Sequence, residues 1–267
     1  MLLRLFLLAF FSLSFAAGDA LAQNAAGSTA APATVADDYA DLTWPNLVRT
    51  LVRFNAINIA DPVIIDEYAI ITECDLYKAF YHDDFKWNQV RKAVHESIKM
   101  NVSTYPVNYR YSVTIQLGRY DFTAKLFRFN KLTKMTNVNT FKMFAVNNRS
   151  CGADNVKSLP HNFRVVLTEP IFLEGLPLSE KDSETMLRRM EDDGNTNRLL
   201  YTRFNLRIVY IDPLRKQVEG TGPGATTLYL QHDFKDYSDI RLDARLDSID
   251  FYTDPAMTHL VYEYAPY

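Results

Sequence analysis

Residues 109–129 read YRYSVTIQLGRYDFTAKLFRF, and the spacing of their apolar side chains sets the expected fold class. Apolar and polar residues alternate through residues 109–117, which is the period of a strand with one buried face. We expect a turn at Gly118-Arg119 and a returning strand over residues 120–129. The stretch therefore predicts a β-hairpin.

Upstream of this hairpin, apolar residues recur at helical spacing from Leu42 to about Val102. The expected helix starts are Thr43 as an N-cap, Asp61-Pro62, the capping-box-like Thr72-Glu73-Cys74-Asp75, and Asp83 or Asp84. The last of these helices carries a buried stripe at Trp87, Val90, Val94 and Ile98.

Downstream, the period of two returns. We expect strands over residues 141–146, 163–168, 201–211, 226–234, 240–251 and 258–264, with one helix inserted after Ser179. Helices first and consecutive strands afterwards predict an α+β fold, in which an N-terminal helical segment precedes a mostly antiparallel β-sheet. The expected boundaries are 41–104 for the helical segment and 105–267 for the sheet region, with 41–267 as one compact unit.

The N-terminus has the pattern of an export signal. Residues 1–22 contain Arg4, an apolar run from Leu5 to Ala17, and the small-residue triplet Ala20-Leu21-Ala22. We expect cleavage after Ala22 and a flexible tether over residues 23–40. The apolar run is too short to span a membrane, so no transmembrane anchor is expected after signal removal. The expected location is the periplasm in a Gram-negative cell, or otherwise the exterior.

Composition excludes several classes of protein. The 267 residues are 48% hydrophobic and 23% charged, which is typical of a globular chain and not of a disordered one. Cleavage after Ala22 would leave 267 − 22 = 245 residues. The formal net charge of −3 lacks the basic excess of a nucleic-acid-binding protein, so we expect no nucleic acid partner.

The chain has two cysteines, Cys74 and Cys151. An oxidising compartment favours a disulfide between them, and two unpaired thiols are the alternative. In the chain-entropy model, closing the intervening loop stabilises the fold by about 4 to 5 kcal/mol. A nucleophilic Cys74 with His82 or His161 as its base would need a sequence signature that neither cysteine carries.

Other site motifs are weak or missing. No histidine pair has zinc-site spacing, and the cluster His82-Asp83-Asp84 is explained by helix capping. The loop at residues 220–224 lacks the lysine of a phosphate-binding loop, and no G-x-S-x-G elbow occurs. Carboxylates such as Asp66-Glu67 are too numerous to assign. We therefore predict no catalytic residue, cofactor or metal.

Aromatic residues are abundant, with 16 tyrosines and 17 phenylalanines that concentrate in the expected strands. Tyr105, Tyr109, Tyr111 and Tyr120 lie around the hairpin. Tyrosine suits a surface that recognises a glycan or a protein, although ordinary core packing also explains it.

Two stretches resemble a family of exported bacterial proteins of unknown function: ADPVIIDEYAIITECDLYKAFYHDDFKWNQVR at residues 60–91, and YSVTIQLGRYDFTAKLFRF at residues 111–129. The resemblance implies export and carries no catalytic motif.

These observations favour a non-enzymatic envelope binding protein whose partner is an envelope protein or a glycan. One alternative is a periplasmic hydrolase, which would bring together several of the acidic, cysteine and histidine side chains in one cleft; they are Asp66, Glu67, Cys74, His82, His161 and His232. Another is a lipid-binding protein with an apolar cavity in a curved sheet.

Overall fold

A computed structural model describes residues 38–144, 151–212, 226–229 and 239–266. The expected signal and its cleavage after Ala22, most of the tether, the loop at residues 220–224 and His232 lie outside the described residues. Residues 38–267 form one compact unit.

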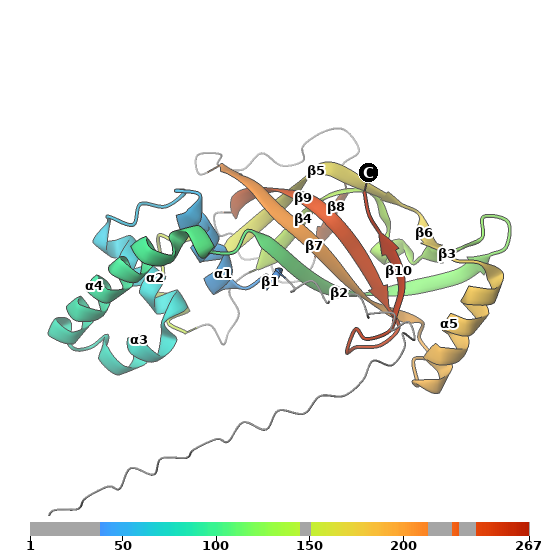
Figure 1. The fold of residues 1–267 in the computed structure, drawn as a ribbon, viewed down its shortest axis with the longest axis horizontal. Coiled ribbons are helices and arrows are strands. Elements are labelled where there is room, and N and C mark those ends of the chain that lie inside the picture. Colours follow the sequence, from blue (N-terminus) through green and yellow to red (C-terminus); the bar gives the residue numbers. More distant parts are fainter. Residues whose placement is uncertain (1–37, 145–150, 213–225, 230–238, 267) are drawn as a thin grey trace, which may run out of the picture. The chain divides into compact units, whose positions relative to one another are not determined.

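Four α-helices lie side by side beside the sheet (Figure 1), and they are α1 (Trp44–Arg53), α2 (Pro62–Thr72), α3 (Cys74–Phe80) and α4 (Asp84–Asn101). Asp61 and Asp83 cap α2 and α4 through their side chains, as the sequence predicts. Thr72 does not cap α3, because its hydroxyl donates instead to the Tyr68 carbonyl one turn back. A 3₁₀ turn, η1 (Val102–Thr104), follows α4.

Within the described residues, the sheet has ten strands. They are β1 (Ala40–Asp41), β2 (Asn108–Asp121), β3 (Leu126–Phe129), β4 (Met135–Phe144), β5 (Asn162–Leu173), β6 (Gly175–Pro177), β7 (Leu199–Asp212), β8 (Thr226–Tyr229), β9 (Asp239–Tyr252) and β10 (Leu260–Tyr264). The order is β6-β3-β2-β7-β9-β5-β4-β8, with β1 added beside β2 and β10 beside β9.

The expectation of a mostly antiparallel sheet needs correction, because the sheet is mixed. Among the described strands, three pairs are parallel: β1 with β2, β4 with β8, and β5 with β9. The parallel β5–β9 pair forms across a long crossover that contains α5 (Glu180–Asp192) and β7. Periodicity reveals a strand and its buried face but not the direction of its neighbours, which is why the sequence did not predict these pairs.

The expected turn at Gly118-Arg119 is wrong. β2 runs on to Asp121, and the chain reverses over residues 122–125. The Asp121 carboxylate causes the reversal, because it accepts hydrogen bonds from the backbone N–H groups of Thr123 and Ala124. Gly118 instead allows close strand approach, since a Cβ there would lie 3.0 Å from the Arg128 carbonyl oxygen.

Other strand boundaries also differ from the predicted ones. β4 begins six residues before the expected Phe141, β5 continues through Glu169-Pro170, and β6 was not predicted. Simple alternation along β7 would place Tyr210 on the same face as the buried Phe204, Leu206 and Ile208, but Tyr210 is exposed because the strand register shifts after Ile208. The helix after Ser179 is α5, and the Ser179 hydroxyl caps it as predicted.

One hydrophobic core joins the helices to the sheet. It includes Leu47 and Leu51 of α1 together with Tyr109, Phe204 and Phe251 of the strands. The last residues of the expected tether belong to the sheet, because Ala40 pairs with β2 and the Tyr39 hydroxyl donates to Asp247.

Candidate functional site

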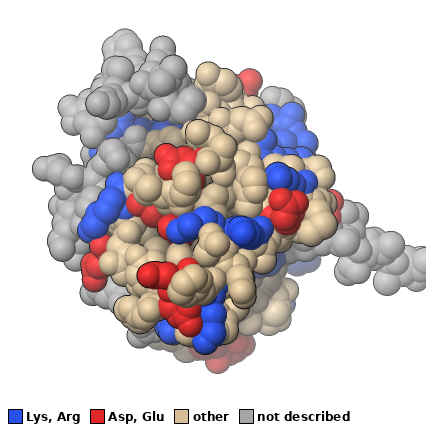
Figure 2. Space-filling model, turned by 90° about the vertical axis from the view of Figure 1, so that its left-hand side faces the viewer, with Lys and Arg blue, Asp and Glu red and all other residues tan. Residues whose placement is uncertain are grey.

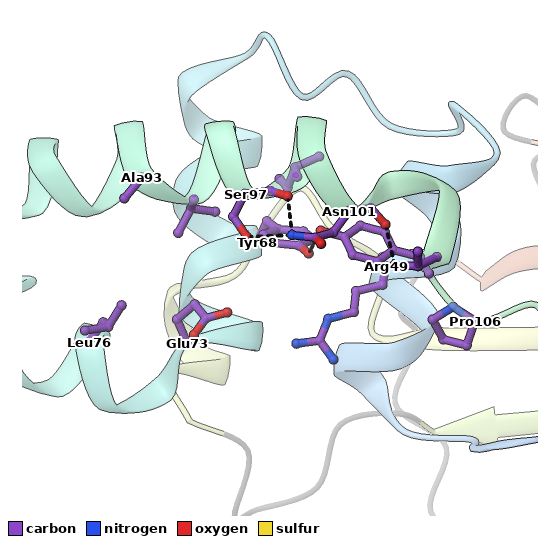
Figure 3. A pocket seen from close by; sticks show the side chains of 12 residues that line it. Arg49, Tyr68, Glu73, Leu76, Ala93, Ser97, Asn101 and Pro106 are labelled. Atoms are coloured by element: carbon purple, nitrogen blue, oxygen red, sulfur yellow. Dashed lines mark hydrogen bonds between the residues drawn. The ribbon is translucent and has the colours of Figure 1, made fainter.

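A groove of about 510 Å³ opens among α1, α2, α3, α4 and η1 (Figure 3). Its apolar wall is formed by Leu76, Ala93, Val94 and Ile98, and its polar groups include Arg49, Glu73, Ser97 and Asn101. This volume lies within the range of pockets that hold small ligands.

The spacing of small residues on α4 opens this groove. Val94 and Ile98 are buried, as the predicted stripe requires. Ala93, Ser97 and Asn101 follow one another at steps of four, so they form a row along one face of α4. Because the first two side chains are short, the space between α4 and α3 stays open (Figure 3).

Two tyrosines lie at the back of the groove. The Tyr68 hydroxyl donates to the Tyr105 hydroxyl over 3.0 Å, and both side chains are buried. Burial raises the pKa of Tyr68, although the positive charge of Arg49 opposes this shift. Tyr68 therefore stays protonated at neutral pH, and its buried hydroxyl adds no charge to the groove.

Arg49 and Glu73 extend toward one another from opposite sides of the groove (Figure 3). Both side chains are half-buried. Arg49 donates to the Asn46 carboxamide oxygen over 3.2 Å, and within the described residues no ion pair joins either charge to another side chain. The groove thus holds two opposite charges without a counter-charge from another side chain in the described part of the chain, although Arg49 also contacts the neutral side chains of Asn46 and Tyr68.

The segment 151–161 holds the helices beneath the groove in place. A disulfide joins Cys74 of α3 to Cys151, as the sequence predicts, with the two Cα atoms 5.7 Å apart. Both cysteines are in this disulfide, so a nucleophilic Cys74 thiolate is not available. Gly152 has φ of 61° and packs so closely that a Cβ would lie 2.4 Å from Ile70.

Glu67 binds the same segment from α2. It is 3% exposed, and its carboxylate accepts four hydrogen bonds of 2.7 to 2.9 Å from the backbone N–H groups of Lys157, Ser158 and Leu159. These backbone donors replace the water that a buried carboxylate loses, so the hydrogen-bonding capacity of Glu67 is used within the fold and its role is structural. Sequence patterning gave no signal for this role.

The other candidate residues that the structure describes do not converge in one cleft. Asp66 accepts from the Arg91 guanidinium in two bonds of 2.7 Å and from the Trp87 indole at 3.0 Å. The His82 ring packs against Tyr81, and the His161 ring lies between the Val156 carbonyl and Trp44. Among the residues that the structure describes, no three His, Cys, Asp or Glu side chains form a group suited to a metal ion.

A second cavity, of about 290 Å³, lies where β5 and β10 meet β9. β5 pairs with β9 up to Ala244, and β10 takes over from Ile249, so the sheet splits between these residues. The charged residues Glu169, Arg245 and Asp247 line it, and the last two form an ion pair at 3.0 Å. Its lining is therefore mixed rather than apolar.

Acidic and basic side chains are interspersed over the helical end of the compact unit (Figure 2). That face carries no broad field of a single sign. Within the described ranges, none of the helices is long and apolar enough to cross a membrane.

Residues 61–188 match the model of a protein family described as a domain of unknown function (DUF4852). The match includes α2, α3, α4 and the segment that carries Cys151, but not Arg49 of α1. Searches of curated proteins and of solved structures gave no significant match.

Proposed function

We propose that this protein is an exported, non-enzymatic binding protein of the cell envelope, and that the groove among α1–α4 is its binding site. The observation that carries the proposal is a groove of about 510 Å³ with one apolar wall and two charges of opposite sign that form no ion pair with the described residues. Apolar surface with a few well-placed polar groups is the usual composition of a ligand site.

Export is supported by the pattern of residues 1–22 and by the disulfide. Disulfides persist in oxidising compartments such as the periplasm, and they are rare in the cytosol. The expected location is accordingly the periplasm of a Gram-negative cell, or the exterior.

The groove supports binding better than hydrolysis. A hydrolase needs an acid and a base, or a nucleophile and a base, within reach of one reacting atom. Asp66 and Glu67 are adjacent in sequence, but they bind different partners, and the Cys74 sulfur is in a disulfide. Among the described residues that line the groove, Glu73 is the one carboxylate.

The proposal is tested by blocking the groove. Ala93 is exposed at its rim, so Ala93→Trp fills the opening without disturbing the core. Lys92→Trp places the same side chain on α4 outside the groove and is the matched control. The purified chain is dialysed against the small-molecule and peptide fraction of an envelope extract, and retained compounds are identified by mass spectrometry.

We expect the unmodified chain and Lys92→Trp to retain a common compound that Ala93→Trp does not retain. Equal retention by all three proteins, or retention by none, would contradict binding in the groove.

A further inference from the structure

We propose that the groove binds a short peptide with free termini, whose ammonium group lies at Glu73 and whose carboxylate lies at Arg49. This inference rests on the proposed function and names its ligand class. It follows from the arrangement of charge, apolar surface and volume in the groove.

The two charges define the ends of the ligand. Glu73 and Arg49 approach the groove from opposite sides (Figure 3), and neither is neutralised by an ion pair within the part of the chain that the structure describes. A half-buried charge gains when a ligand supplies its counter-charge, because it has already lost part of its water. A ligand of one sign would satisfy one group and repel the other, whereas a zwitterion satisfies both.

The apolar wall defines the middle of the ligand. Leu76 is partly exposed on α3, and Val94 and Ile98 face it from α4. An aliphatic ligand side chain placed against this wall would remove apolar surface of both Leu76 and the ligand from water.

Asn101 provides a contact for a peptide backbone. Its side-chain nitrogen donates to the Ser97 carbonyl over 2.9 Å. Its carboxamide oxygen accepts no hydrogen bond from the described residues and is available to a peptide N–H.

Volume limits the length. About 510 Å³ lies toward the lower end of the range for ligand pockets, which suits roughly two to four residues. A neutral glycan of this size would use Asn101 and the tyrosines but would leave Arg49 and Glu73 without counter-charges. The charges thus favour the peptide, and the glycan becomes an outcome of the test.

The test compares three probes by isothermal titration calorimetry: the tripeptide Ala-Leu-Ala with free termini, its N-acetylated form, and its C-terminal amide. We expect the unmodified chain to bind the free tripeptide at least about tenfold more tightly than either capped form, since each cap removes one charge-assisted contact. Lys92→Trp should behave as the unmodified chain, and Ala93→Trp should not bind.

Glu73→Gln tests the assignment of the two ends. It should weaken binding of the free tripeptide about tenfold and should abolish the effect of acetylation, while the effect of amidation persists. Arg49→Gln should also weaken binding of the free tripeptide, but it should abolish the effect of amidation while the effect of acetylation persists. Arg49→Lys should restore part of the affinity. Circular dichroism and the melting temperature report whether each variant is folded; if Arg49→Gln does not fold, Glu73→Gln and the capped peptides decide the question.

Equal affinity for the free and capped tripeptides would overturn the inference, as would no binding of the free tripeptide. The proposal that the groove is a binding site would still stand if dialysis recovered a compound whose retention Ala93→Trp abolishes. Recovery of a neutral glycan in that way would replace the peptide as the ligand class. Failure of the blocking experiment would remove the proposed function as well.

Discussion

The helical end and the sheet are held together in different ways. β7 pairs with β2 along one edge and with β9 along the other, and the buried side chains of these strands form much of the core. The four helices share this core, and they are also fixed to residues 151–161 by one disulfide, by the buried Glu67 carboxylate and by the bond from the Trp44 indole to Pro160. Stability in the sheet comes from many paired strands, whereas the helical end adds a few specific contacts to the core that it shares with the sheet.

Among the changes considered, removal of the disulfide should lower the free energy of unfolding most. The bond closes a loop of 77 residues, so Cys74→Ser with Cys151→Ser should lower the free energy of unfolding by about 4 kcal/mol. Urea denaturation followed by circular dichroism measures the loss, and reduction of the unmodified chain should reproduce it. An unchanged midpoint after reduction would show that the helical end does not depend on the bond.

Glu67→Gln should have the next largest effect. An amide nitrogen would replace one of the oxygens that accept from three backbone N–H groups, which leaves buried donors without a partner. We expect a loss of about 2 to 3 kcal/mol in the same assay. Glu96→Gln is the control, because Glu96 is exposed on α4 and should change little. Equal losses for the two variants would refute the special role of Glu67.

Loss of an exposed ion pair on the sheet should lower the free energy of unfolding least. Arg245 lies on β9 and pairs with Asp247 over 3.0 Å, but its side chain is 58% exposed. Water screens such a pair, so Arg245→Gln should cost less than about 1 kcal/mol. A loss as large as that of Glu67→Gln would mean that stability is not spread over the sheet.

The elements that the sequence predicted well are those determined by nearby residues. The capping residues Asp61, Asp83 and Ser179 and the buried stripe of α4 follow from spacing within one helix. On β9, Leu242, Ala244 and Leu246 are buried opposite the charged residues, as alternation predicts.

The groove and the sheet topology depend on distant contacts. Spacing on α4 indicates which residues are buried, but it does not show that Ala93 and Ser97 lie across from Leu76 and Glu73. The sequence likewise does not reveal the role of Glu67, because its backbone donors lie 90 to 92 residues further along the chain. The parallel β5–β9 pair likewise required the three-dimensional arrangement.

The most direct test of binding in the groove is amide hydrogen exchange of the purified chain, with and without the small-molecule and peptide fraction of an envelope extract. We predict slower exchange in residues 73–76 and 93–106, which contribute to the groove, and no such change in Ala93→Trp. Protection confined to residues 168–171 and 245–247 around the sheet cavity, or equal protection in Ala93→Trp, would contradict it.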